Sequence, residues 1–397
     1  KFLTHPIWGV PIFLAIMAFI FFLTFTIGDI FKEYLVEGID FVSTNLTMLL
    51  DSIHASPVIS SLLIDGAIAG VGGILAFLPN IFILFLALAV LEDSGYMSRV
   101  AFVMDGIMGK VGLSGRAFIP LLLGFGCSVP AIMASRALED PRDRLKTILV
   151  TPFMSCSARL PIYILFSGMF FPDNAMLAAF SMYILGIVVA IVMARIFYKL
   201  DKPTEKNVLL IELPEYKSPN VASIFFYAWE KVKSYLSKAG TTIFVASIII
   251  WFILNFNFDG MVNINDSFGA SIGKFLAPLL IPAGLGLWQI VVALISGLAA
   301  KEVVVASLSV LYGISNINSS EGMSYMVSQL AQVGFTQLNA YVLMIFCLLY
   351  TPCIASIVTI KKETNSTKCM MFSIVFQLIV AYIVSTIVYQ IGSILLN

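Results

Sequence analysis

The sequence predicts an all-α, polytopic membrane protein with two inverted-topology gate repeats whose helices are broken or re-entrant. The first observation is composition: 59% of the 397 residues are hydrophobic, 12% are charged, and the mean hydropathy is +0.98. An ordinary soluble domain is about half apolar and about a quarter charged. The second is a series of apolar segments of about 20 residues, the length that crosses a bilayer. The third is a weak internal similarity between two interrupted apolar segments.

The spans follow one another along most of the chain. The first covers about residues 7–28, and the acidic stretch 29–61 after it is typical of an amphipathic segment in the membrane interface. The span at about 66–91 begins with several glycines, which let helices approach closely. Further spans are predicted at about 147–168, 175–198, 240–256, 275–295, 289–312, 336–360 and 370–396, two of which overlap.

Loop charges orient these spans. The loops at 136–146, 195–238 and 361–368 are rich in Lys and Arg and should be cytoplasmic. The N-terminus is then inside and the C-terminus outside. The segment 117–135 has basic residues on both sides and the segment 289–312 has external loops on both sides, so each should enter and return, from opposite faces. Net charge is zero, which gives no reason to expect a nucleic-acid partner.

An internal repeat agrees with this orientation. Residues 111–135 align with 283–307, with Gly112 on Gly284 among five identities. Farther along, Thr151-Pro152 aligns with Thr351-Pro352. Inverted repeats with broken helices at the membrane midplane are a transporter architecture. The predicted division is 1–61 for the first helix and external segment, 62–200 for gate repeat 1, 201–238 for a cytoplasmic linker with an amphipathic helix, and 239–397 for gate repeat 2 with the C-terminal helix.

The candidate site is the break in 117–135, at Gly124 to Met133. Two glycines and Pro130 prevent a continuous helix there. We expect carbonyls up to Gly126 to attract a cation, Ser128 to cap the next half-helix, and the Cys127 thiolate to act as a soft metal ligand.

Ser155 and Cys156, after the helix-bending Pro152, are predicted as a second ligand pair. Met133 could add a thioether. The alternative is that these are buried packing residues, since an unpaired Cys often behaves as a small hydrophobe. The number and membrane depth of the five cysteines do not suggest a disulfide framework.

Charged residues inside apolar segments are further pathway candidates. Glu302 could bind a cation or carry a proton, or it could form an ion pair with Lys301 that locks the repeat. Glu92, Asp93 and Asp105 could lie at a pathway mouth. Alternatively, these three cap helices or pair with nearby arginines.

Several motifs together resemble the membrane domain of the ferrous iron transport protein B (FeoB) family. They are Leu91 to Met97 (LEDSGYM), Gly124 to Arg136 (GFGCSVPAIMASR) and Ser155 to Pro161 (SCSARLP). The resemblance covers nearly the whole chain and is supported by Leu298-Ala299-Ala300-Lys301-Glu302. It implies ferrous iron (Fe²⁺) uptake across the bacterial inner membrane, gate repeats similar to those of concentrative nucleoside transporters, and a metal path along the motifs of Cys127 and Cys156.

The resemblance also implies partners. A cytoplasmic GTP-binding domain, with GTP and Mg²⁺, normally precedes the membrane domain, and a small accessory protein or a homo-oligomer would fit the family. This chain has no Gly-x-x-x-x-Gly-Lys-Ser/Thr phosphate loop and does not begin with Met. We therefore expect a transporter fragment that is not itself an enzyme and has no cofactor of its own.

Two other function classes stay open on the residues alone. One is a cation-coupled transporter of nucleosides or other small solutes, which would tolerate Ser in place of Cys. The other is a membrane-embedded signalling or assembly subunit with a packed interior at Cys127 and no transport activity.

Overall fold

The structure is a computed structural model that describes residues 9–54, 56–68, 72, 75, 78–201, 220–236, 241–312 and 320–396. Helices make up nearly all of this part of the chain. The strands within it, β1 (Phe256–Asn257) and β2 (Gly260–Met261), pair as an antiparallel hairpin. Outside the described residues lie the first residues of the predicted first span, most of 69–77, and parts of the linker 201–238 and the loop 313–335.

Contacts within the chain define two compact units, Lys1–Thr151 with Ala190–Val245 and Pro152–Val189 with Ala246–Asn397. The first contains α1 (Gly9–Ser52), α2 (Pro57–Ser61), the π-helix η1 (Leu62–Ile68), α4 (Leu78–Asp93), α5 (Tyr96–Val111), α6 (Phe118–Leu123), α7 (Ser128–Ala134), α8 (Pro141–Val150) and α11 (Val221–Tyr235). The second contains α9 (Leu160–Phe170), α13 (Phe268–Leu280), α14 (Trp288–Ser296), α15 (Val303–Leu311), α16 (Ser320–Gln332), α17 (Gln337–Leu349), α18 (Ile354–Thr364) and α19 (Thr367–Leu396). Helices α10 (Ala175–Leu200) and α12 (Thr241–Asn255) contribute to both units. These two units do not test the predicted boundaries of the gate repeats, which stay a prediction.

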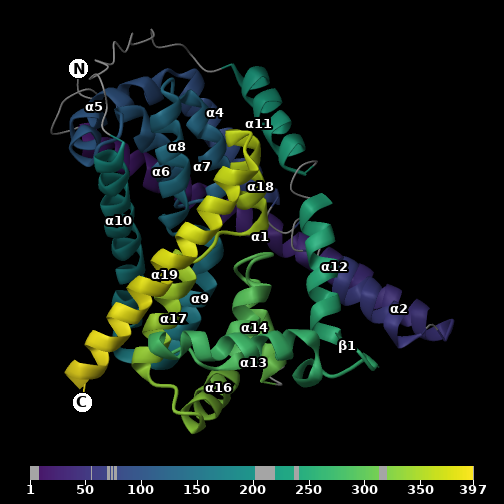
Figure 1. Ribbon diagram of the computed structural model, residues 1–397. Coiled ribbons are helices and arrows are strands. Elements are labelled where there is room, and N and C mark those ends of the chain that lie inside the picture. Colours follow the sequence, from purple (N-terminus) through teal and green to yellow (C-terminus); the bar gives the residue numbers. More distant parts are fainter. Residues whose placement is uncertain are drawn as a thin grey trace. The chain divides into compact units, whose positions relative to one another are not determined.

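Short 3₁₀ turns connect several helices. They are η2 (Gly115–Ala117), η3 (Ser135–Ala137), η4 (Thr151–Phe153), η5 (Ser157–Arg159), η6 (Pro172–Asn174), η8 (Ile264–Asp266) and η9 (Ile281–Ala283). Within the first unit, α11 lies along α4, and within the second, α17 packs against α19 and α9 (Figure 1).

Helix α1 corrects the expected end of the first span. It continues without a break through Ser52, so most of the stretch expected as a separate interfacial segment is the second half of one helix. The polar side chains of that half support the helix by bonding back to it: Thr44 and Thr47 each donate to a carbonyl four residues earlier. Nearer the start, Gly28 lets α4 approach, because a Cβ there would overlap Asn80.

Both predicted helix breaks are confirmed. In the first unit, α6 ends at Leu123 and α7 begins at Ser128. In the second, α14 ends at Ser296 and α15 begins at Val303. Glycine at the first break and a buried Lys in the second account for the interruptions, since neither favours a continuous apolar helix.

Three predicted spans contain interrupted helices. The interruption at Pro152 was expected, and the other two were not. Residues 275–295 contain the end of α13 and nearly all of α14, and the two helical segments, Phe268–Ala283 and Trp288–Ser296, are bent by 102° relative to each other. The span 336–360 is broken between α17 and α18 at Pro352, and 147–168 is broken between α8 and α9 after Pro152. Proline removes a helix hydrogen bond, which explains both of these breaks. The basic loop 136–146 is also shorter than predicted, because α8 already begins at Pro141.

The structure strengthens the internal repeat at Gly112 and Gly284. Both glycines end a helical segment in the left-handed region, with φ of 92° and 71°. In both, the next N–H reaches back five residues, from Leu113 to Met108 and from Leu285 to Leu280, as in a Schellman motif. In both, a Cβ would collide with a tyrosine ring, that of Tyr198 or of Tyr389. The same helix-ending turn, with a left-handed glycine, therefore precedes the broken segment in each repeat.

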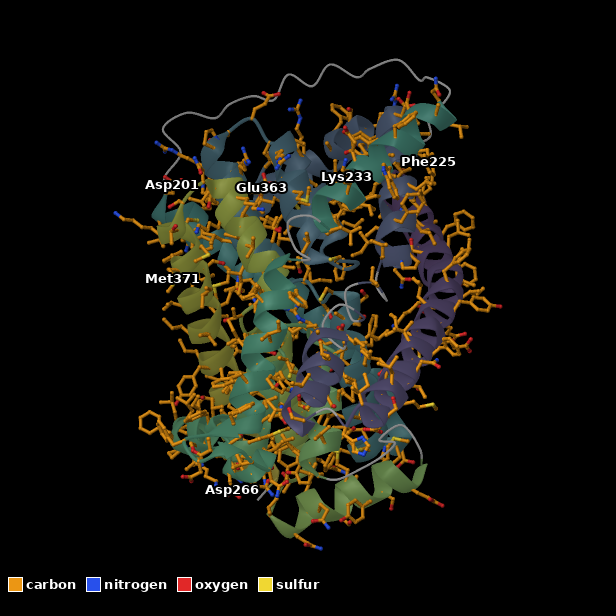
Figure 2. The ribbon with its side chains drawn as sticks, turned by 90° about the vertical axis from the view of Figure 1, so that its right-hand side faces the viewer. Asp201, Phe225, Lys233, Asp266, Glu363 and Met371 are labelled. Atoms are coloured by element: carbon orange, nitrogen blue, oxygen red, sulfur yellow. The ribbon has the colours of Figure 1, made fainter. Side chains whose placement is uncertain are left out.

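Apolar side chains are exposed on the long helices, as expected for lipid-facing surfaces. Met371 on α19 is 50% exposed and is labelled in Figure 2. Among the described residues, five helices are long and apolar enough to cross a membrane, or up to seven if each of two bent pairs is one span. A soluble protein would not carry so many such helices, so the membrane class is confirmed.

Candidate functional site

The break at Cys127 is a tight turn followed by an extended residue. The N–H groups of Phe125 and Gly126 donate to the carbonyls of Leu122 and Leu123, which tightens the last turn after α6. Cys127 itself is extended, with φ −152° and ψ 132°, and it is the N-cap residue of α7. Its side chain is half-buried and is not in a disulfide. The thiol thus lies at the junction of two half-helices, as predicted.

Ser128 corrects the predicted capping arrangement. It is the first residue of α7 rather than the cap, and it is buried. Cys127 takes the cap position, and its carbonyl accepts from the N–H of Ala131 at 3.3 Å. Pro130 falls in the first turn as expected, where its missing N–H costs nothing. Met133 is half-buried near the other end of α7.

The break at Cys156 belongs to the second unit. Cys156 is half-buried and precedes η5 as its N-cap residue. Ser155 is fully buried, and its hydroxyl donates to the hydroxyl of Tyr163 at 3.2 Å. The Ser155 side chain would therefore exchange this partner if it bound a metal.

Arg159 holds this break together. Its guanidinium is almost fully buried and donates to the carbonyl oxygens of Met154 at 2.7 Å and Pro152 at 3.0 Å. From the sequence, Arg159 is expected to pair with an acid or a carbonyl, and the carbonyl alternative is confirmed. The structure shows that it satisfies two carbonyls left behind by the proline break, which otherwise would be buried at a cost.

Lys301 and Glu302 lie between α14 and α15. The ammonium of Lys301 donates to the carbonyl of Thr351 at 2.5 Å and lies 3.1 Å from the ring centroid of Tyr350. Glu302 is half-buried at the start of α15. Lys301 thus links two separate breaks of the second unit instead of serving only its own turn.

The acidic candidates of the first unit have structural partners. Asp105 accepts from the N–H of Gly115 at 2.8 Å and so caps η2. Glu92 accepts from the hydroxyl of Tyr227 at 2.9 Å, and Asp93 accepts from the N–H of Asn220 at 3.0 Å. These contacts favour capping for Asp105. Glu92 and Asp93 bond to residues of the α11 region in place of the expected arginine pairing, and Arg116 itself pairs with Glu139. Through these hydrogen bonds, Glu92 and Asp93 hold α11 against the end of α4.

The contact between Tyr227 and Glu92 gives a pH-dependent prediction. Burial, followed by the Glu92 carboxylate, raises the pKa of Tyr227 above its ordinary value. Because the pKa is higher in the folded state, the protonated Tyr227 hydroxyl contributes its full stabilisation of the folded state below pH about 10, the pKa of tyrosine in the unfolded chain. This stabilisation is lost as the pH rises above that value. Tyr227→Phe should weaken the docking of α11 by about 1 kcal/mol at neutral pH.

Hydrogen exchange of α11 in the purified protein measures this effect. Exchange should accelerate above pH about 10 in the parent, after correction for the intrinsic rate, and much less in Tyr227→Phe. Tyr325→Phe, at a half-exposed tyrosine of α16, is the control and should behave as the parent. Equal pH dependence in the parent and Tyr227→Phe would contradict the assigned contact.

The described residues contain no group of three or more His, Cys, Asp and Glu side chains placed to hold a metal ion. The structure gathers the predicted site residues in two places, one in each unit: Gly126, Cys127 and Ser128 at the first break, and Ser155 with Cys156 at the second. Tyr163 and Tyr350, which are partners at the breaks, were not predicted from the sequence. Tyrosines in apolar segments carry no distinguishing pattern, so only their contacts identify them.

Comparisons with known proteins agree with this architecture. A family model described as Gate, nucleoside recognition, matches residues 74–170 and 236–367, and one described as ferrous iron transport protein B C terminus matches 179–231. A Staphylococcus aureus (strain MSSA476) protein named Fe(2+) transporter FeoB is 44% identical over 395 residues, which are 99% of this chain and 58% of the relative. A Campylobacter jejuni protein of the same name is 41% identical, over 100% of this chain and 65% of the relative.

A third relative, from Porphyromonas gingivalis, is named a Fe(2+) transport protein A/Fe(2+) transporter FeoB fusion protein. It is 37% identical over 98% of this chain and 50% of its own length. No solved structure matches the chain significantly.

The fold and the comparisons define a polytopic α-helical membrane protein of the gate-repeat class, because the Gate matches cover more than half of the chain and include both broken segments. The chain belongs to the ferrous iron transport protein B family and corresponds to its membrane domain. It spans 58% of the length of the Staphylococcus aureus relative.

Proposed function

We propose that this chain is the permease part of a transporter that carries Fe²⁺ into the bacterial cytoplasm. The observation that carries the proposal is the placement of a half-buried cysteine at a helix break in each unit, Cys127 and Cys156. Irregular backbone at membrane depth occurs where it is buried in protein or lines a wet cavity. The relatives' printed names supply the identity of the ion.

The chemistry of the two breaks suits a ferrous ion in transit. A thiolate is a soft ligand that binds transition metals in preference to Na⁺ or Mg²⁺. At the first break, carbonyl oxygens near Gly126 and the Ser128 hydroxyl can complete a temporary coordination shell. At the second break, the Ser155 hydroxyl can take that role. A pathway ion must leave as readily as it enters, so a few ligands at a time are better suited than a closed four-ligand site.

The proposal extends to the whole protein and its setting. A cytoplasmic GTP-binding domain, lying outside this chain, would bind GTP and Mg²⁺ and regulate the permease, which itself catalyses no reaction. The Porphyromonas gingivalis fusion supports a small accessory protein as a partner. The basic loops support an inner-membrane orientation with the N-terminus inside.

Anaerobic Fe²⁺ uptake by cells that lack their own ferrous transporter tests the proposal. The full-length parent should restore uptake, and Cys127→Ser and Cys156→Ser should each lower it about tenfold or more, because serine keeps the size but not the soft ligand. Cys369→Ser is the matched control, since Cys369 is also half-buried, and it should retain parental uptake. All variants are compared at equal abundance in the membrane.

A Gate description that mentions nucleosides favours one second candidate, transport of a nucleoside or similar solute. It predicts parental activity in both serine variants and uptake of a labelled nucleoside in place of Fe²⁺. Parental Fe²⁺ uptake in the double variant Cys127→Ser/Cys156→Ser would remove the cysteines from the proposed path and leave Glu302 as the remaining candidate. If the full-length protein in vesicles transported neither Fe²⁺ nor a nucleoside, both transport proposals would be contradicted.

A further inference from the structure

Two backbone breaks are joined within the second unit. Three hydrogen bonds link the region of the break between α14 and α15 to the region of the break between α17 and α18. The N–H of Ile354 donates to the carbonyl of Leu298 at 2.8 Å, and the hydroxyl of Tyr350 donates to the carbonyl of Leu294 at 3.3 Å. Lys301 supplies the third contact and is the charged member of the set.

The surroundings of the Lys301 ammonium resemble those of a bound cation. The side chain is only 2% exposed, its nitrogen contacts the Thr351 carbonyl, and the face of the Tyr350 ring lies 3.1 Å away. Carbonyl oxygens and aromatic faces are both favourable neighbours for monovalent cations.

The first proline break of the same unit has a comparable arrangement. There the carbonyls of Pro152 and Met154 are held by the Arg159 guanidinium. Thr151-Pro152 and Thr351-Pro352 are the residues that the internal repeat aligns. In both repeats, a basic side chain of the protein therefore donates hydrogen bonds to carbonyls next to a Thr-Pro break.

We propose that Lys301 is a tethered cation, whose ammonium occupies a monovalent-cation position formed by the carbonyl of Thr351 and the ring of Tyr350. The covalent attachment means that the second unit keeps its two breaks joined without a dissolved Na⁺ or K⁺ ion. If an uncharged side chain of similar length replaces Lys301, a dissolved Na⁺ or K⁺ ion should be able to bind at the vacated ammonium position. This inference concerns monovalent cations and does not depend on the proposed transport of Fe²⁺.

Thermal unfolding of the purified full-length protein tests the inference, with NaCl, KCl or N-methylglucamine chloride as the salt. The parent should unfold at the same temperature in all three salts. Lys301→Met keeps the aliphatic stem but leaves the ammonium position empty. Its unfolding midpoint should be higher by about 5 °C in NaCl or KCl than in N-methylglucamine chloride, because only the small ions can enter and stabilise the folded state.

Lys274→Met is the matched control in the same unit. The Lys274 ammonium also contacts a carbonyl, that of Asn265 at 3.2 Å, and an aromatic ring, that of Trp288 at 5.4 Å. Lys274 is exposed, so water replaces its ammonium and no dependence on the cation is expected.

Three results would overturn the inference. The first is an unfolding midpoint of Lys301→Met that is equal in all three salts. The second is a parent that depends on the cation as strongly as Lys301→Met does. The third is failure to recover folded Lys301→Met even in NaCl or KCl, because a dissolved cation should then fill the vacated position.

Discussion

Arg159→Met is expected to destabilise the second unit severely. The side chain is 1% exposed and its two terminal nitrogens hold the carbonyls of Met154 and Pro152. Methionine fills part of the space but offers no donor. Each buried carbonyl left without a partner costs about 1–3 kcal/mol, so the expected loss is about 2–6 kcal/mol. Because domains are stable by only about 5–15 kcal/mol, much of the variant should be lost from the membrane.

Thermal unfolding of the purified full-length parent and its variants, together with membrane abundance, measures this loss. Arg159→Lys keeps the charge but not the planar fork that reaches two carbonyls, so it should fall between the parent and Arg159→Met. Arg142→Met is the control, because Arg142 pairs with Asp201 at 3.3 Å on the exposed surface. Exposed ion pairs contribute at most about 1 kcal/mol. Equal stability of Arg159→Met and Arg142→Met would show that the guanidinium does not hold the break.

Gly297→Ala is expected to force apart the two joined breaks of the second unit. The backbone of Gly297, with φ −65°, accepts alanine, so only space is limiting. A Cβ would lie 2.5 Å from the Tyr350 hydroxyl and would also collide with Val304. Both neighbours are buried and cannot withdraw without leaving a cavity. The expected loss is about 1–3 kcal/mol, the usual effect of overpacking a core.

The unfolding midpoint again measures the effect, at about 2–4 °C per kcal/mol for a unit of this size. Gly168→Ala is the control, because a Cβ at Gly168 of α9 meets nothing within 4 Å and alanine favours helix. Adding Val304→Ala to Gly297→Ala should recover part of the loss by removing one collision, beyond the cost of Val304→Ala alone. A midpoint of Gly297→Ala at or above that of Gly168→Ala would contradict the close approach.

Much of the architecture could be predicted from residues that act locally. Apolar segment length set the membrane class, and glycine, proline and buried charge marked the breaks at Cys127 and Lys301. The bend at Pro152 was expected from the proline. The span that contains Pro352 was predicted without a break, because segment hydropathy does not register a single missing N–H. The long α1 was missed for the opposite reason: its charges indicated an interface, while its backbone had nothing to stop the helix.

The sequence by itself determined that the chain crosses the membrane, where the segments of Cys127 and Lys301 are interrupted and which motifs are repeated, because hydropathy and backbone chemistry are properties of neighbouring residues. Tertiary structure alone decided which groups satisfy those interruptions. The carbonyl that receives Lys301 is 50 residues away, and Glu92 meets a tyrosine 135 residues away. Such pairings depend on how helices pack, and a buried donor or acceptor takes whichever partner the packing brings within reach.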